Sequence, residues 1–126
     1  MKIADVSKEY GLSADTLRYY ERIGLLPGVT RTESGIRDYS EQDLARVQFV
    51  KCMRDASVSI EALIEYMNLF EEGEHTAAAR KVLLEEQRDL VEKRIADMQA
   101  GLDRLNKKIE NYEDMLAKER EIRGVA

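Results

Sequence analysis

The sequence predicts a mainly α-helical protein in which a small head of four short helices and a β-hairpin is followed by one long helix. Helix caps and glycines divide residues 1–73 into short segments, whereas a heptad repeat of apolar residues runs through the second half. Of the 126 residues, 36% are charged and only 6% are aromatic. Because this composition does not support one large core, part of the apolar surface is expected to need a partner chain.

The first two helices are predicted over about 3–10 and 14–23. Gly11 closes the first helix at the C-terminal position that favours glycine. Ser13 is a good N-cap for the second helix, and Gly24 ends it. The short turn between these helices indicates a helix-turn-helix.

The segment 30–39 is predicted to form a β-hairpin. Ser34 and Gly35 lie at its centre, with β-compatible residues on both sides. Two helices followed by a hairpin are the layout of a winged helix-turn-helix, with the hairpin as the wing.

Two further helices complete the predicted head. Ser40 and Asp43 resemble a capping box that begins a third helix over about 41–55. Ser59 is placed to cap a fourth helix over about 60–71.

The long helix is predicted from about residue 76 to residue 120, where Gly101 is the only glycine or proline. Its apolar residues follow a heptad spacing, and a stripe this narrow needs a second long helix, for which another copy of the chain is the natural candidate. A solvated single helix is the alternative. We therefore divide the chain into a head (1–73), a dimerisation helix (74–121) and a tail (122–126). The residues of the dimerisation stripe are Leu84, Val91, Ile95, Met98, Leu102, Leu105, Ile109, Tyr112 and Leu116.

A basic stripe on the second helix predicts DNA binding. Arg18, Tyr19 and Arg22 share one helical face. Arginine pairs with phosphates or reads guanine, and a tyrosine hydroxyl can bond a phosphate. For any one of these residues alone, a solvated surface charge or a half-buried tyrosine is an equal alternative. The hairpin adds Arg31, Arg37 and Tyr39.

Charge, composition and motifs limit the other classes. The net charge of −5 lies wholly in residues 58–126, because residues 1–57 carry nine Lys/Arg and nine Asp/Glu. A neutral head can still bind DNA if its basic residues share a face. No membrane-length apolar run, signal segment, nucleotide loop, catalytic triad or paired-carboxylate motif is present, so we expect a cytoplasmic, nucleoid-associated protein that is not an enzyme and has no cofactor.

Several motifs resemble the MerR family of transcription regulators. They are the run Thr16-Leu17-Arg18-Tyr19-Tyr20-Glu21, the wing Ser34-Gly35-Ile36-Arg37-Asp38-Tyr39 and the segment Val58-Ser59-Ile60. Within the family, Lys51-Cys52-Met53-Arg54 resembles the AdhR/NmlR-type branch, which responds to aldehydes and electrophiles.

The resemblance implies a mechanism and a set of contacts. The long helices pair as an antiparallel coiled coil, and the dimer binds a pseudo-palindrome in double-stranded promoter DNA. Effector binding then bends and untwists the promoter spacer, which realigns the promoter elements for RNA polymerase. The implied backbone contacts are Arg18, Tyr19, Tyr20, Arg37 and Tyr39, with Thr16 near the groove.

The same resemblance makes Cys52 the expected sensing residue, through attack of its thiolate on a reactive carbonyl or an oxidant. Lys51 and Arg54 are the basic neighbours that could favour the thiolate. From the residues alone, packing is the favoured reading, because Cys52 shares a helical face with Phe49 and Met53. A metal site is not expected, since a single histidine and a single cysteine lack helical spacing. A non-covalent ligand or a metal as the switch, with Cys52 only structural, remains the alternative.

Overall fold

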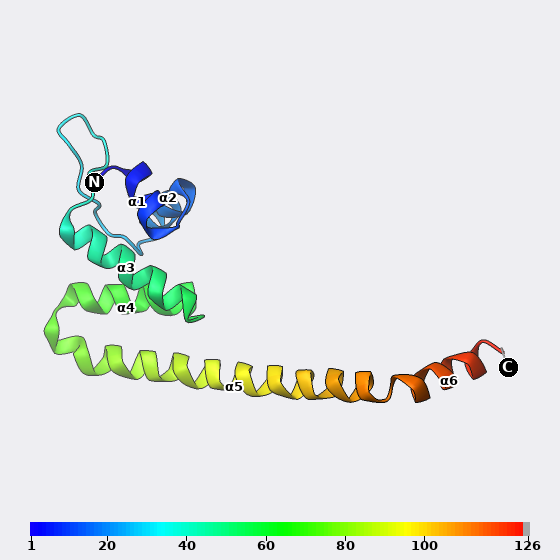
Figure 1. The fold of residues 1–126 in the computed structure, drawn as a ribbon. Helices are drawn as coiled ribbons and strands as arrows, with labels where there is room; N and C mark the ends of the chain where they lie inside the picture. Colours follow the sequence, from blue (N-terminus) through cyan, green and yellow to red (C-terminus); the bar gives the residue numbers. More distant parts are fainter. Residues whose placement is uncertain (125–126) are drawn as a thin grey trace. The chain divides into compact units, whose positions relative to one another are not determined.

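The computed structural model describes residues 1–124, and these contain six α-helices and one short 3-10 helix (Figure 1). The four helices of the predicted head are confirmed to within one residue at each end. Residues 1–88 form one compact unit and the chain from residue 89 forms a second. The elements are α1 (Ile3–Tyr10), α2 (Ala14–Arg22), α3 (Glu41–Asp55), α4 (Ile60–Glu72), η1 (Glu74–Thr76), α5 (Ala77–Glu110) and α6 (Tyr112–Ile122).

The predicted helix caps form as hydrogen bonds. Gly11 ends α1 in the left-handed conformation, with φ at 69°. The Ser13 hydroxyl accepts a hydrogen bond from the N–H of Thr16 at 3.0 Å, and Ser59 caps α4 in the same way. Local side-chain chemistry therefore sets where these helices begin and end.

The core of the first unit lies where α1 to α4 and the start of α5 meet. α1 packs against both α2 and α3, and α3 packs against α4 (Figure 1). Leu83 of α5 joins this core, and the Gln87 side chain accepts a hydrogen bond from the N–H of Ser59. The compact unit thus includes the first part of α5, beyond residue 73. Its most buried residues are Val6, Leu17, Leu25, Leu26, Val47, Val50 and Leu63.

The wing differs from the predicted hairpin. Residues 1–124 contain no strand, and Arg31 and Arg37 pair only in an isolated antiparallel bridge. Gly35 turns the chain with φ at 85°, and backbone bonds join Thr32 to Ile36 and Thr30 to Asp38. The arms are too short for a ladder, and two-stranded pairings of this length are marginal without further support.

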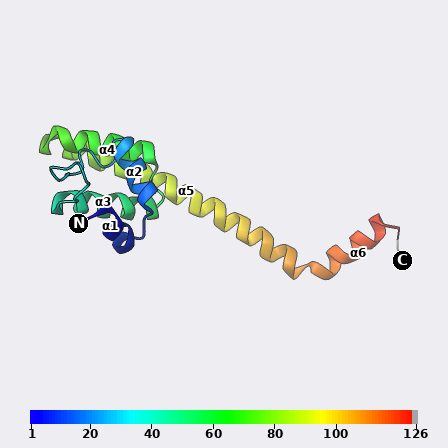
Figure 2. The same ribbon diagram turned by 90° about the horizontal axis from the view of Figure 1, so that it is seen from above.

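The predicted single long helix is also corrected, because it is interrupted at Asn111. Asn111 has φ −98° and ψ 23°, and Figure 2 shows the chain changing direction in this orange region. Lys107 and Lys108 lie in the last turn of α5, whereas Glu113 and Asp114 lie in the first turn of α6. These charges suit two helix ends, and asparagine favours caps over helix interiors.

Within residues 1–124 no helix is long and apolar enough to cross a membrane. The predicted tail begins inside α6, whose last residue is Ile122, and residues 125–126 lie outside the described residues.

Candidate nucleic-acid interface

Helix α2 presents the predicted basic stripe at the surface. Its apolar side turns Leu17 and Tyr20 into the core, which leaves the opposite side exposed. Arg18 bonds the Asp15 carboxylate at 3.0 Å, and the guanidinium of Arg22 lies 5.2 Å from the centre of the Tyr19 ring. Both arginines are therefore held on the helix surface with nitrogen donors open to solvent.

Thr16 acts at the start of α2 as part of the helix cap. Its N–H donates to the Ser13 hydroxyl, which in turn donates to the Thr16 hydroxyl at 2.8 Å. The side chain is partly exposed. Thr16 thus lies at the positive end of the helix dipole, where backbone N–H groups suit a phosphate.

The wing arginines are bound to α2 through Glu21. Its carboxylate accepts hydrogen bonds from Arg31 at 3.0 Å and from Arg37 at 2.9 Å. Sequence reasoning did not select Glu21, because no local spacing pairs a helix residue with positions 10 and 16 residues later. Its place within the Leu-Arg-Tyr-Tyr-Glu run was the one available signal.

Tyr20 and Tyr39, two of the predicted DNA contacts, are largely buried. The two residues are only 7% and 3% exposed, so both rings pack in the core of the head. Burying an aromatic ring removes 150–250 Å² from water, roughly, and this favours packing over exposure. The Tyr39 hydroxyl is buried without a hydrogen-bond partner within residues 1–124. Burial raises the pKa of this hydroxyl.

Asp43 holds the base of the wing. This buried carboxylate accepts hydrogen bonds from the backbone N–H groups of Thr30 and Ser40, which flank the wing, at 3.0 and 2.9 Å. The Ser40 hydroxyl accepts the N–H of Asp43 in return and completes the predicted capping box. Burial alone would raise the Asp43 pKa, but these hydrogen bonds outweigh it and lower the pKa below 3.8.

Cys52 lies near the end of α3 with its side chain exposed. Phe49, one turn earlier, instead stacks on Tyr66 with the ring centres 4.8 Å apart. The expected basic neighbours are engaged elsewhere: Lys51 bonds the Asp55 carboxylate, and Arg54 bonds the carbonyl of Val58. Cys52 is therefore accessible to a small reagent and is not packed in the core of the described chain.

The predicted dimerisation stripe is largely exposed on α5 and α6. Met98 is 76% exposed and Leu105 is 62% exposed, while Leu84, Val91 and Leu116 are partly buried. Apolar side chains in a continuous line at a helix surface indicate an interaction surface. The exposed members of the stripe are Ile95, Met98, Leu102, Leu105, Ile109 and Tyr112.

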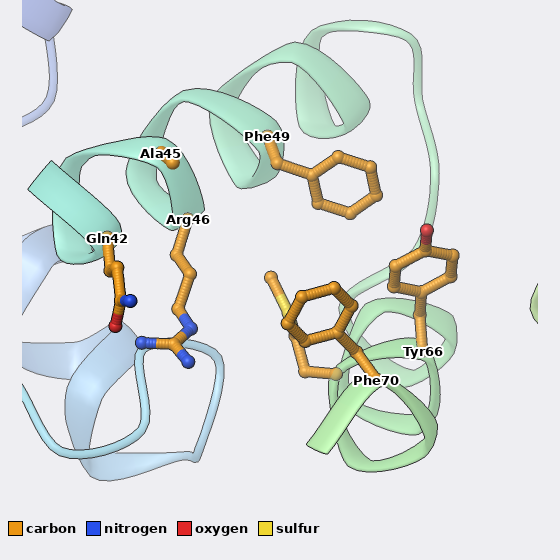
Figure 3. Close-up of a pocket in the computed structure, with 7 residues that line it drawn as sticks. Gln42, Ala45, Arg46, Phe49, Tyr66 and Phe70 are labelled. Atoms are coloured by element: carbon orange, nitrogen blue, oxygen red, sulfur yellow. The ribbon is translucent and has the colours of Figure 1, made fainter. Parts of the chain in front are cut away.

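A cavity of about 400 Å³ lies between α3 and α4 (Figure 3). Phe49, Tyr66 and Phe70 supply aromatic faces, while Gln42 and Arg46 supply polar groups at its other end. Arg46 bonds Glu71 at 2.9 Å. Within the part of the chain that the structure describes, no group of three or more His, Cys, Asp or Glu side chains could hold a metal ion.

Comparison with known proteins gives two family matches and several relatives. The MerR HTH family regulatory protein model matches residues 1–70, and the MerR DNA-binding model matches residues 44–117. The transcriptional regulator AdhR of Bacillus subtilis is 58% identical over 93 residues, which are 73% of this chain and 66% of AdhR.

Two solved structures share the fold. A MerR family regulator from Listeria monocytogenes has a TM-score of 0.81 and 50% identity, with 96% of this chain and 92% of that chain covered. HiNmlR, described as lacking the sensor domain and bound to promoter DNA, has a TM-score of 0.75 and 31% identity, with 92% of each chain covered.

Proposed function

This chain is a DNA-binding transcription regulator of the MerR family, and we propose that it acts as a homodimer on a pseudo-palindromic operator in promoter DNA. Its relatives are named as regulators rather than enzymes. The observation that carries the proposal is the joined surface of α2 and the wing. Arg18 and Arg22 are exposed on α2, and one carboxylate of the same helix holds Arg31 and Arg37 of the wing.

The proposed DNA contacts come from the exposed part of this surface. The recognition helix α2 offers Arg18, Tyr19 and Arg22, and its capped start offers Thr16 and backbone N–H groups. The wing offers Arg31 and Arg37 to the adjacent phosphates. Tyr20 and Tyr39 support this surface from within the core. HiNmlR, which aligns with 92% of this chain, is described as bound to promoter DNA.

The proposed dimer forms along the exposed apolar stripe of α5 and α6. Paired antiparallel, two such helices would bury residues that a single chain leaves in water, and each buried methylene contributes about 0.8 kcal/mol. In the proposed antiparallel pair, the distance between the two heads is fixed by the paired helices. The heads can then read two half-sites of one operator.

In the proposed mechanism the dimer acts through the shape of the DNA. It binds the spacer between two promoter elements and, when the effector binds, bends and untwists this spacer so that RNA polymerase can engage both elements. The cost of deforming DNA depends on its sequence, so spacer sequence contributes to the choice of promoter. The DNA and RNA polymerase are thus the proposed partners besides the second copy.

The proposed switch is the thiol of Cys52, supported by its exposure in the described chain. The thiolate sulfur adds to the carbonyl carbon of an aldehyde and forms a C–S bond. The carbonyl electron pair moves to oxygen, which takes up a proton, so the product is a hemithioacetal. The added group changes the end of α3, and packed helices respond by moving between discrete arrangements.

A non-covalent effector is the second candidate, and the cavity between α3 and α4 favours it. Phe49 of α3 and Tyr66 of α4 line this cavity with stacked rings, and Phe70 lies next to Tyr66 on α4 (Figure 3). Its volume suits a small, largely apolar ligand. In this case Cys52 is structural and its replacement leaves induction intact.

The experiment that tests the proposal selects binding sites from a pool of random DNA duplexes. We expect an enriched site with two inverted half-sites, bound by two chains and preferred to random DNA by at least about 10³-fold. Footprinting and in vitro transcription then locate the site relative to the promoter elements. A pool without enrichment, or a site bound by one chain, contradicts the proposal.

A further inference from the structure

The carboxylate of Glu21 joins α2 to both arms of the wing. Its Oε2 accepts a hydrogen bond from Nη2 of Arg31 at 3.0 Å, and its Oε1 accepts one from Nε of Arg37 at 2.9 Å. Arg31 and Arg37 also face each other in the isolated bridge of the wing. One carboxylate therefore holds the two residues that pair across the wing, through two charge-assisted hydrogen bonds.

This contact is more enclosed than the other ion pair on α2. The Glu21 side chain is 19% exposed, whereas the Asp15 side chain that bonds Arg18 is 95% exposed. Partly buried pairs are screened less by salt than exposed ones. Since the wing has no strand ladder to stiffen it, the Glu21 contact is a main restraint on where its arginines lie.

Glu21 and a DNA phosphate are chemically similar partners for a guanidinium group. Each arginine has five N–H donors, so Arg31 and Arg37 can stay bonded to Glu21 and still donate to a phosphate. Glu21 also cancels one positive charge on this surface. The sequence-independent part of DNA affinity depends on how many phosphates the protein neutralises. Each neutralised phosphate contributes about 0.9 to the slope of log affinity against log salt concentration. Glu21 therefore helps to hold the wing arginines in place, and its negative charge weakens the attraction of this surface to DNA of any sequence.

On the basis of the proposed function, in which α2 and the wing bind DNA, we propose that Glu21 is a positioning residue that determines specificity. It fixes Arg31 and Arg37 against the recognition helix for operator binding, and it limits the affinity of the same surface for random DNA. The residue contacts the arginines and not the bases.

Three variants distinguish the effect of the Glu21 charge from its effect on the position of the wing arginines. Glu21→Gln removes both the charge and the strong acceptor. Glu21→Asp keeps the charge but is one methylene shorter, so it cannot hold both arginines in the same geometry. Asp15→Asn is the matched control, because it removes one negative charge from the same helix without touching the wing.

Binding to the selected operator and to random duplex is measured by fluorescence anisotropy at several salt concentrations. We expect Glu21→Gln to bind random duplex about threefold more tightly at low salt, with a steeper salt slope. Its operator-to-random ratio should fall roughly tenfold. Glu21→Asp should lower this ratio without tighter random binding. Asp15→Asn should tighten operator and random binding by similar factors, so its ratio should stay near the wild-type value. Thermal unfolding checks that every variant folds.

An unchanged ratio in both Glu21 variants overturns the proposal, as does a fall of equal size in Asp15→Asn. Proton–nitrogen NMR of the arginine Nε–H groups tests the contact without DNA. The Arg37 resonance should move in Glu21→Gln and stay in Asp15→Asn, and an Arg37 resonance unmoved in Glu21→Gln refutes the contact. A wild-type protein that shows no preference for the operator would refute the proposed function. In that case the NMR result still tests whether Glu21 contacts Arg37.

Discussion

The side chain of Asp43 accepts a hydrogen bond from the backbone N–H of Thr30, 13 residues earlier in the chain, at 3.0 Å. The same oxygen accepts the N–H of Ser40 at 2.9 Å. One buried carboxylate oxygen thus joins both ends of the wing to the first turn of α3. This contact and the Glu21 contact fix the wing at its base and along its arms.

Asp43→Ala should destabilise the head, because it leaves two partly buried N–H groups without their acceptor. The expected loss is about 1.5–3 kcal/mol in the free energy of unfolding. Urea denaturation followed by circular dichroism measures it. Glu41→Ala, an exposed position in the same turn, is the control and should change the free energy little. Equal losses in the two variants would contradict the role of Asp43.

The contribution of Asp43 to the free energy of unfolding should also depend on pH. The pKa of Asp43 is lower in the folded protein than its ordinary value of 3.8, because the hydrogen bonds outweigh burial. The stabilisation is therefore fully present above pH 3.8 and is lost as pH falls through the lower folded pKa. The stability gap between wild type and Asp43→Asn should narrow below pH 3.8. A gap that stays constant down to acid unfolding would disprove this assignment.

Arg18→Ala and Arg22→Ala should each weaken operator binding. A hydrogen bond between charged groups is worth on the order of 1.5–3 kcal/mol, and the salt slope should fall by about 0.9 for each lost phosphate contact. Anisotropy titrations at several salt concentrations provide both values. Arg120→Ala, which removes the same charge from α6, is the control. Operator affinity that is unchanged in both α2 variants would rule out this face.

Leu105→Glu should yield monomers, because it places a charge in the middle of the apolar stripe. Analytical ultracentrifugation measures the change in mass. Asn106→Glu adds the same charge to the neighbouring exposed position outside the stripe and should remain dimeric. A Leu105→Glu protein that stays dimeric and binds the operator normally would show that the stripe is not the interface.

Cys52→Ser should bind the operator as wild type does but fail to respond to an aldehyde in transcription assays. The change keeps the size of the side chain and removes the strong nucleophile. After reaction with a small thiol-selective electrophile that forms an irreversible adduct, intact mass spectrometry should detect one adduct per wild-type chain and none on the variant, because the chain has a single cysteine. Full induction of the variant would favour the cavity between α3 and α4 as the effector site, and Phe49→Ala would then abolish the response.

Local sequence determined the four helices of the head and the orientation of the basic stripe on α2. Ser13, Ser40 and Ser59 mark helix starts through bonds to residues three positions away, and such bonds form wherever the local chain turns into a helix. Apart from the break at Asn111, the heptad spacing likewise predicts the apolar stripe along α5 and α6. These features depend on neighbours within one or two turns, so they can be read along the chain.

Tertiary structure alone decided which side chains of the site are exposed and which are fixed by hydrogen bonds to distant parts of the chain. Tyr20 and Tyr39 carry polar groups that fit DNA, yet packing buries both rings, since removing an aromatic surface from water outweighs keeping its hydroxyl in solvent. Glu21 and Asp43 reach partners 10 to 16 residues away only because the head folds the wing over α2 and α3. Contacts of this kind depend on how elements pack, and no spacing in the sequence encodes them.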